Sequence, residues 1–320
     1  MDQSTQFRGV ARVIQSGNTV VELATGMADE STTLACASNV RFQLASVSKQ
    51  FAAAATLMLV EDAVVSIEDP VGRWIDGCPK AWGTMTVRHL MTHTAGLSTW
   101  VDLPEIDLFT RMDAQDEIAI FQRAPLRSEP GSDWYYSSPG YVLLAHIVEQ
   151  ASGASYADFL TRRIFSPLSM TDTFVGNGLG HDRLASGHRG DQPVPSFELD
   201  VVGIGAGDIW STLDDLSRWH GAFGEDQLLA TSSREAMFAR QTPLDAPLDL
   251  GDLSVGWYGY GWFIGTAFGH PLLVHLGDNS GYVSLNAIVP DLDIHLMILS
   301  NDEQTDRFGL AHSMLEPLLT

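Results

Sequence analysis

Lysine is almost absent from this chain of 320 residues, whose 18 basic residues include only Lys49 and Lys80 as lysines. Positive charge is scarce as a whole, because 40 acidic residues bring the formal net charge to −22 at pH 7. Nucleic acids and anionic membranes attract basic surfaces, so this composition argues against both as partners.

Cysteine is also rare. The two cysteines, Cys36 and Cys78, have no metal-binding spacing, and we expect two free thiols rather than a disulfide.

His89 and His93 lie four residues apart, but no third ligand accompanies them, so we expect a packing role and no metal. Gly205-Ala-Gly207 lacks the third glycine of a dinucleotide-binding loop, and we expect no cofactor.

Long apolar segments are missing as well. No run reaches the length of a transmembrane helix. Residues 1–6 contain neither the basic nor the apolar region of a signal peptide. We therefore expect a cytoplasmic protein, or a secreted one if a leader has been removed.

What the chain does contain is a clear order of secondary-structure patterns. Residues 7–14 and 19–23 alternate in the manner of strands around a turn at 16–18, which predicts a hairpin. Residues 50 to about 170 are mostly helical between prolines, with a clear helix at 140–153. Strand patterns then return at 260–264, 272–276, 282–289 and 295–300, and a last helix is expected at 308–319.

Strand groups at both ends of a helical middle predict an α+β fold. We expect a central, mainly antiparallel sheet flanked by helices, with the N- and C-terminal strands adjacent and an all-helical lobe inserted. The chain is then a single catalytic domain over 1–320. Its sheet part covers about 1–60 and 200–320, and its helical lobe about 61–199.

A candidate nucleophile lies next to one of the two lysines, in Ser46-Val-Ser-Lys49. The apolar, alanine-rich run from Phe51 to Val60 predicts a buried helix, with Ser46 at its first turn. Residues three apart share a helix face, which puts the Ser46 hydroxyl beside the Lys49 amine. A partly buried lysine can lose its proton and activate a serine, whereas arginine cannot. The alternative is an N-capping serine followed by a surface lysine.

Two later segments offer the further polar groups that such a site needs. Tyr136 precedes the helix at 140–153, and it could move protons if Lys49⁺ lowers its pKa. His275-Leu-Gly277-Asp278 ends a predicted strand, where a glycine allows close backbone approach to a ligand. The alternatives are aromatic packing and an ordinary edge-strand histidine.

Together these segments resemble the serine-reactive penicillin-recognising family, which includes class C β-lactamases, DD-peptidases, D-aminopeptidases and family VIII carboxylesterases. The family motifs S-x-x-K, Y-x-N and K-T-G or H-x-G correspond in order to Ser46–Lys49, Tyr136–Ser138 and His275–Gly277. Residues 42–51, 87–97, 165–173 and 205–216 also match the family's habits, so the resemblance covers nearly the whole chain.

The resemblance implies a β-lactamase/transpeptidase-like fold and roles for individual residues. Ser46 would form an acyl-enzyme, Lys49 would activate it, and Tyr136 would relay the proton to the leaving group. The backbone N–H groups of Ser46 and Asp278 would form the oxyanion hole. The substrate would be a small acyl compound. Trp262 lies in the region expected near it, where it would either contact the ligand or pack in the core and cleft wall.

Two departures from the motifs affect the expected substrate. Ser138 replaces an asparagine that helps to recognise amides, and serine has a single donor. His275 replaces a lysine, which weakens the expectation of a carboxylate-bearing substrate such as a β-lactam.

We therefore expect a serine hydrolase for small acyl esters or D-amino-acid-type amides, with a slight preference for esters. The alternatives are a D-alanyl-D-alanine carboxypeptidase or D-aminopeptidase, a class C-like β-lactamase, a biosynthetic acyltransferase, and an inactive acyl-binding or assembly relative. The sequence sets neither the acyl chain length nor the oligomeric state.

Overall fold

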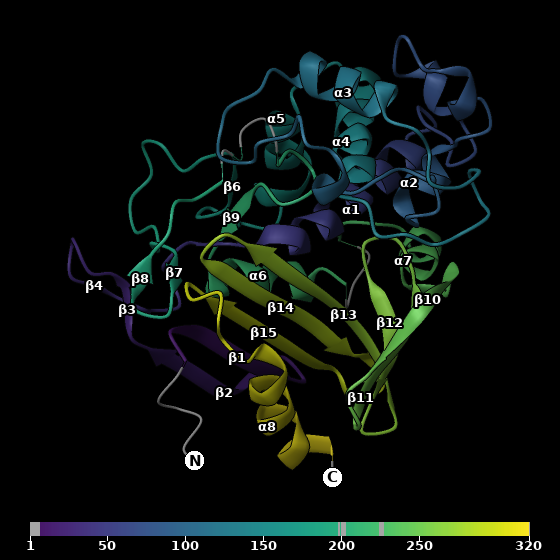
Figure 1. The fold of residues 1–320 in the computed structure, drawn as a ribbon. Helices are drawn as coiled ribbons and strands as arrows, with labels where there is room; N and C mark the ends of the chain where they lie inside the picture. Colours follow the sequence, from purple (N-terminus) through teal and green to yellow (C-terminus); the bar gives the residue numbers. More distant parts are fainter. Residues whose placement is uncertain (1–6, 198, 200–202, 224–226, 320) are drawn as a thin grey trace.

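The computed structural model describes residues 7–197, 199, 203–223 and 227–319, and its centre is one large antiparallel sheet (Figure 1). The sheet has eight strands in the order β10-β11-β12-β13-β14-β15-β1-β2. Their bounds are β1 Gly9–Gln15, β2 Asn18–Thr25, β10 Thr242–Asp249, β11 Leu253–Tyr258, β12 Phe263–Ala267, β13 His270–Asn279, β14 Tyr282–Val289 and β15 Ile294–Ser300.

The strands of this sheet that come first and last in the chain, β1 and β15, pair with each other. β1 runs antiparallel to β15, with Gly9 opposite Ser300, and β1 also forms the predicted hairpin with β2. The expected adjacency of the N- and C-terminal strands is therefore confirmed. In the central strands β14 and β15, residues on both faces are buried, because helices cover both faces of the sheet there.

Helices lie on both sides of the sheet. α6 (Leu213–Gly221) packs on β1 and β15 from one face, and α8 (Arg307–Leu319) packs on β14 and β15 from the other (Figure 1). α1 (Ser48–Glu61) contacts α7 (Thr231–Phe238) and α4 (Ser138–Ser152). Its residues from Ser48 to Leu59 are all buried, and the small side chains of residues 52–55 allow its neighbours to approach closely.

The lobe above the sheet in Figure 1 is helical up to about residue 170. It contains α2 (Val87–Met91), α3 (Ala114–Arg123), α4, α5 (Tyr156–Leu160) and a π-helical turn at Thr161–Phe165. The fold class is confirmed, but the lobe is not all helical. It also contains the short strands β6 (Phe174–Val175), β7 (His188–Arg189) and β8 (Gln192–Pro193).

Short strands join the lobe to the rest of the chain, since β6 pairs with β9 (Ile209–Ser211), which pairs with β5 (Phe42–Gln43). A separate two-stranded sheet outside the lobe is formed by β3 (Met27–Asp29) and β4 (Leu34–Ala35). Strands of two or three residues are too short to show a period-2 pattern, which is why the sequence did not predict them.

The region around Tyr260 differs from the prediction in a way that matters for the site. Of the expected strand at 260–264, only residues 263–264 belong to a strand, β12. Residues 260–262 form a turn between β11 and β12, and Gly261 has a φ of +76°. A Cβ at Gly261 would lie 2.9 Å from the Lys49 carbonyl oxygen, so the turn packs directly on α1. Since β12 begins at Phe263, opposite Val274, the end of β13 from His275 onward has no strand partner on this side among the described residues.

Two other expectations concern the thiols and membranes. Cys36 is buried, Cys78 is partly buried, and both are free, as predicted. Within the described ranges, no helix is long and apolar enough to cross a membrane.

Candidate active site

Ser46 lies in a strained turn at the start of α1. It is the middle residue of a 3-10 turn, Ala45–Val47, that leads directly into the helix. Ala45 has a φ of +49°, a left-handed conformation that costs energy for a residue with a Cβ. The turn brings the Ser46 Oγ within 2.9 Å of the Lys49 Nζ, so the two side chains meet as the three-residue spacing predicted.

Lys49 is completely buried, and all its polar contacts are short. Its Nζ donates to the Ser46 Oγ, to the Ser138 Oγ at 3.2 Å and to the Ala206 carbonyl oxygen at 2.7 Å. Burial lowers the pKa of Lys49 to about 7, although the nearby charge of Asp208 opposes the shift. A lysine with this pKa can accept a proton near neutral pH.

Ser138 is held in place by the start of α4, of which it is the first residue. The side chain of Ser137 caps the helix by accepting from the Gly140 N–H at 3.4 Å, and its hydroxyl donates to the Ser98 carbonyl oxygen at 2.7 Å. Pro139 suits the first turn of a helix. The Ser138 hydroxyl is therefore fixed against the Lys49 amine.

Tyr136, on the loop before α4, reaches the nucleophile from the other side. Its hydroxyl faces the Ser46 side chain, which partly offsets the rise in the pKa of Tyr136, and the Lys49 Nζ lies 4.9 Å from its ring centroid. The expectation that Lys49 lowers the pKa of Tyr136 is wrong, because desolvation of its hydroxyl raises that pKa well above its usual value. Tyr136 therefore stays protonated and can donate a hydrogen bond, which leaves Lys49 as the better base.

His93 holds the Tyr136 loop, a role that the sequence did not reveal. Its Nδ1 accepts from the Ser137 N–H at 3.1 Å, and its ring centroid lies 4.3 Å from that of Tyr136. The packing role expected for His93 was too general, since this histidine supports a residue of the site. The sequence signal for this role was that His93 lies within residues 87–97, a segment that matches the family.

Gly277 lets β13 approach the nucleophile turn. A Cβ there would lie 2.2 Å from both the Leu44 carbonyl oxygen and the Ser284 Oγ, so a larger residue does not fit. The Ser284 hydroxyl donates to the same carbonyl of Leu44 at 2.7 Å, which ties β14 to the turn. The end of β13, which pairs with β14 but has no strand on its other side among the described residues, thus lies directly beside Ser46.

The side chain of Asp278 points away from the cleft floor and pairs with Arg307 of α8. Their shortest separation is 2.8 Å, and the Asp278 side chain is 65% exposed. Arg307 also donates to the Gly277 carbonyl oxygen at 2.7 Å. The pair explains why an acidic residue is acceptable at this position, since its charge is compensated by Arg307.

His275 is buried and neutral. Its Nδ1 donates to the Leu276 carbonyl oxygen at 2.8 Å, and its Nε2 accepts from the Tyr258 hydroxyl at 3.1 Å. Burial, with a further contribution from Lys49, lowers the pKa of His275 to about 3. It therefore brings no positive charge to the cleft at neutral pH.

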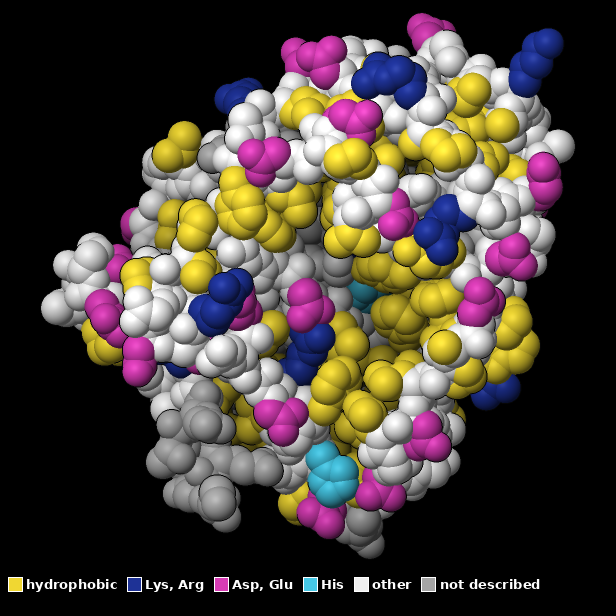
Figure 2. Space-filling view, in the orientation of Figure 1, with side chains coloured by type: hydrophobic (Ala, Val, Ile, Leu, Met, Phe, Trp, Pro, Cys, Tyr) yellow, Lys and Arg dark blue, Asp and Glu magenta, His cyan; other side chains and the backbone are white. Residues whose placement is uncertain are grey.

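These residues share one cleft of about 430 Å³, which is visible as the hollow at the centre of the face in Figure 2. Its lining includes Ser46, Tyr136, Ser138, His275 and Asp278 from the predicted set. The expectation that Trp262 contacts ligand is wrong. Its side chain is completely buried against Phe223 and Phe238, and its neighbour Phe263 lines the cleft instead.

Asp208 is the ionisable residue near the site that sequence reasoning did not single out. It is completely buried, and no side chain or N–H among the described residues makes a standard hydrogen bond to its carboxyl oxygens. Burial raises its pKa to about 7, against the opposing charge of Lys49. Asp208 lies two residues after Ala206, whose carbonyl oxygen accepts from the Lys49 amine. The sequence shows an acid at this position, but nothing in it indicated that the acid is buried.

No group of three or more histidine, cysteine, aspartate or glutamate side chains that could bind a metal ion is found within the described part of the chain. The chemistry available in the cleft is instead that of a serine hydroxyl, a lysine of lowered pKa and a tyrosine hydroxyl. This combination, on an α+β sheet with a helical lobe, defines a serine hydrolase of the penicillin-recognising class.

Comparison with known proteins gives the family. The Beta-lactamase family model matches residues 1–318, and the chain belongs to this family. Penicillin-binding protein 4* of Bacillus subtilis (strain 168) is 30% identical over 336 aligned residues, which cover 97% of this chain and 72% of that protein. Esterase EstB of Burkholderia gladioli is 32% identical over 215 residues, covering 61% of this chain and 53% of that protein.

A solved structure is similar over almost the same extent. The crystal structure of D-amino acid amidase from Ochrobactrum anthropi SV3 has a TM-score of 0.82 and 26% identity, with 97% of this chain and 94% of that chain covered.

Proposed function

We propose that this serine hydrolase cleaves small acyl esters through a covalent acyl-enzyme on Ser46. Lys49 in its neutral form takes the proton from the Ser46 hydroxyl, whose oxygen attacks the ester carbonyl carbon. The backbone N–H groups of Ser46 and Asp278 stabilise the negative charge on the carbonyl oxygen. The low pKa of Lys49 and its 2.9 Å contact with Ser46 support this role.

The leaving alcohol must receive a proton when its bond to the acyl carbon breaks. The Tyr136 hydroxyl, which faces Ser46, passes a proton to the alcohol oxygen and recovers one from Lys49⁺. Water then attacks the acyl carbon and gives a proton to Lys49 by the same route. Lys49⁺ returns that proton to the Ser46 oxygen as its bond to the acyl carbon breaks, and the carboxylic acid leaves. The net reaction is ester plus water to acid plus alcohol.

The observation that carries the choice of ester over amide is the environment of Ser138. Its hydroxyl oxygen accepts from the Lys49 amine, which leaves a single O–H donor for a substrate amide, whereas an asparagine side chain in the same place would keep two N–H donors. The neutral His275 and the pairing of Arg307 with Asp278 leave no uncompensated positive charge among these residues for a substrate carboxylate. The similarity to Esterase EstB agrees with an ester substrate.

Hydrolysis of D-amino-acid amides is the second candidate. The similarity to D-amino acid amidase over nearly the full length of both chains favours it. The deciding experiment compares initial rates on p-nitrophenyl acetate and D-alanine p-nitroanilide, with Ser46→Ala as the blank for both. A rate ratio favouring the ester beyond the ratio of the two reactions in buffer supports the esterase, and a ratio at or below it supports the amidase.

A further inference from the structure

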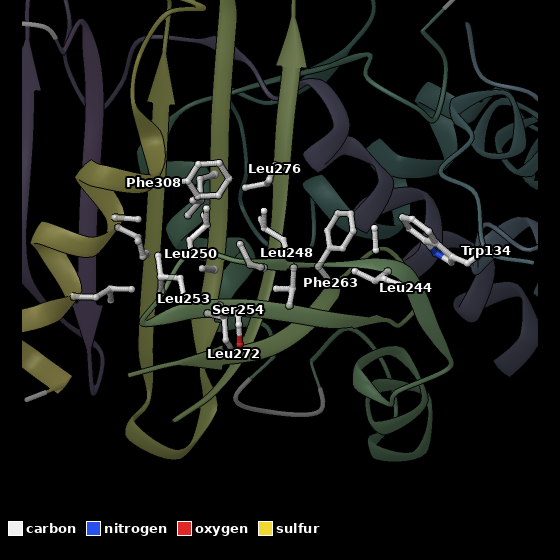
Figure 3. A pocket seen from close by; sticks show the side chains of 18 residues that line it. Trp134, Leu244, Leu248, Leu250, Leu253, Ser254, Phe263, Leu272, Leu276 and Phe308 are labelled. Carbon is white, nitrogen blue, oxygen red and sulfur yellow. The ribbon is translucent and has the colours of Figure 1, made fainter. Parts of the chain in front are cut away.

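An apolar groove of about 150 Å³ lies on the face of the sheet that α8 covers in part (Figure 3). Its floor is formed by β13, β14 and β15, and its walls by α8 and by the strands β10 to β12. Among the described residues that line it, Ser254 is the only polar one. Leu248, Leu250 and Phe308 point into it from opposite walls (Figure 3).

The groove borders the candidate active site. Phe263 and Leu276 line both the groove and the cleft that contains Ser46. Phe263 is the first residue of β12, and Leu276 lies just beyond the point where β13 loses that neighbour. The end of β12 is therefore the place where the groove opens toward the nucleophile.

Aromatic side chains continue this border. The ring of Tyr136 is stacked parallel to that of Phe263 with centroids 6.2 Å apart, and Phe263 lies 6.4 Å from Trp134, which lines the groove. Figure 2 shows hydrophobic side chains continuing from the central hollow to the region between α8 and β10–β12. An apolar chain could follow this path without crossing a charged residue of the lining.

The groove wall is open to water. Leu248 and Leu250 are 37% and 41% exposed, although they face a cavity with almost no polar groups. Exposed leucines do not contribute the free energy that their burial would give. An apolar ligand bound in the groove would bury them and supply that stabilisation.

We propose that the groove binds an aliphatic chain of the ester substrate while the ester carbonyl lies at Ser46. This inference rests on the proposed esterase function and adds a preference for medium-length chains. An apolar cavity of roughly this volume binds a six-carbon ring in other proteins. Each buried methylene therefore increases kcat/KM by about fourfold until the groove is filled.

The test is a chain-length series of p-nitrophenyl esters from acetate to dodecanoate, measured below the critical micelle concentrations. We expect kcat/KM to rise over the first several methylenes and then to level off. A parallel series of alkyl acetates distinguishes the side of the ester that enters the groove. A rise in the first series places the acyl chain there, and a rise in the second places the alcohol chain there.

Two variants connect the preference to the groove. Ala246 lines the groove and is exposed, so Ala246→Phe fills it, and Asp245→Phe adds the same ring at an exposed neighbour that does not line it. Ala246→Phe should lower kcat/KM for the preferred long ester at least tenfold and leave acetate hydrolysis unchanged. Asp245→Phe should change neither. Leu248→Asp provides a second groove variant with the same expectation if Ala246→Phe folds poorly.

Failure of the inference is separable from failure of the proposed function. Ser46-dependent hydrolysis with equal kcat/KM across both series would leave the esterase in place and overturn the groove. If no ester is hydrolysed, decanoate binding to the Ser46→Ala protein by calorimetry decides the question, with Ala246→Phe as control. Binding that Ala246→Phe abolishes would support an apolar-chain site, and no binding would overturn it.

Loss of self-association in Leu248→Asp without any chain-length effect would instead assign the groove to a second copy of the chain.

Discussion

Lys49 and Asp208 are both completely buried, and each shifts the pKa of the other toward its charged form. Burial acts in the opposite direction on both residues, which brings both pKa values to about 7. The two groups therefore titrate as a pair in the range where the protein would work.

Replacement of Asp208 tests this coupling. Asp208→Asn removes the negative charge that favours protonated Lys49, so the pKa of Lys49 should fall. The acidic limb of the pH dependence of kcat/KM should then move to lower pH, with acylation at neutral pH preserved. A steady-state pH profile on p-nitrophenyl acetate measures the shift, and a thermal melt confirms that the variant is folded. An acidic limb at the wild-type position would separate Asp208 from the proton chemistry.

The role of Lys49 predicts a specific pH dependence in the wild-type protein. Only the neutral amine accepts a proton, so kcat/KM should increase with pH through an apparent pKa near 7. Lys49→Arg keeps the charge but cannot lose a proton, and it should lower acylation by roughly 10²–10⁴-fold. Burst kinetics with a fluorophosphonate probe measure acylation directly. Near-normal labelling of Lys49→Arg would transfer the base role to Tyr136.

Ser138 should control the selectivity between esters and amides. Ser138→Asn can accept from the Lys49 amine with its carbonyl oxygen and still donate from its NH₂ group to a substrate amide. One such hydrogen bond corresponds to an increase of up to about tenfold in the ratio of amide to ester turnover. Ser138→Ala is the control and should not raise the ratio. Equal ratios in all three proteins would show that position 138 does not set selectivity.

Glu117 of α3 gives a prediction about stability rather than activity. Its side chain is buried, its carboxyl oxygens have no hydrogen-bond partner among the described residues, and burial raises its pKa to about 9. Because this pKa is higher in the folded state than in the unfolded state, Glu117 destabilises the fold increasingly as pH rises above its unfolded value.

Glu117→Gln should therefore stabilise the protein by about 1–3 kcal/mol at pH 8, and the gain should disappear near pH 4.5. Chemical denaturation at both pH values measures the free energy of unfolding. Asp116→Asn, at the exposed neighbouring position of the same helix, should have almost no effect. A gain that does not depend on pH would mean that the carboxyl of Glu117 is not the cause.

The sequence predicted those parts of the fold and site that depend on local pattern. The hairpin of residues 7–23 and the antiparallel strands 282–289 and 295–300 follow from alternation, and the meeting of Ser46 with Lys49 follows from helical spacing. β10 was not predicted because its eight residues contain two prolines and two aspartates, which are unfavourable in strands.

Features that depend on three-dimensional burial were out of reach. The choice between Trp262 and Phe263 as the cleft residue depends on where β12 begins, and a shift of one residue reverses the face. The raised pKa of Tyr136 depends on how completely its ring is covered, which no neighbour in the sequence indicates. The apolar groove combines β10 with α8, elements more than fifty residues apart in the chain.

The complete burial of Lys49 has a practical consequence for chemical labelling. Since the chain has two lysines, Lys80 is the only lysine exposed to solvent. Amine-reactive dyes or supports should attach at this one side chain, apart from the terminal amino group, while the buried amine beside Ser46 stays unmodified. A conjugate of defined stoichiometry that retains its serine reactivity can therefore be prepared without introducing a cysteine.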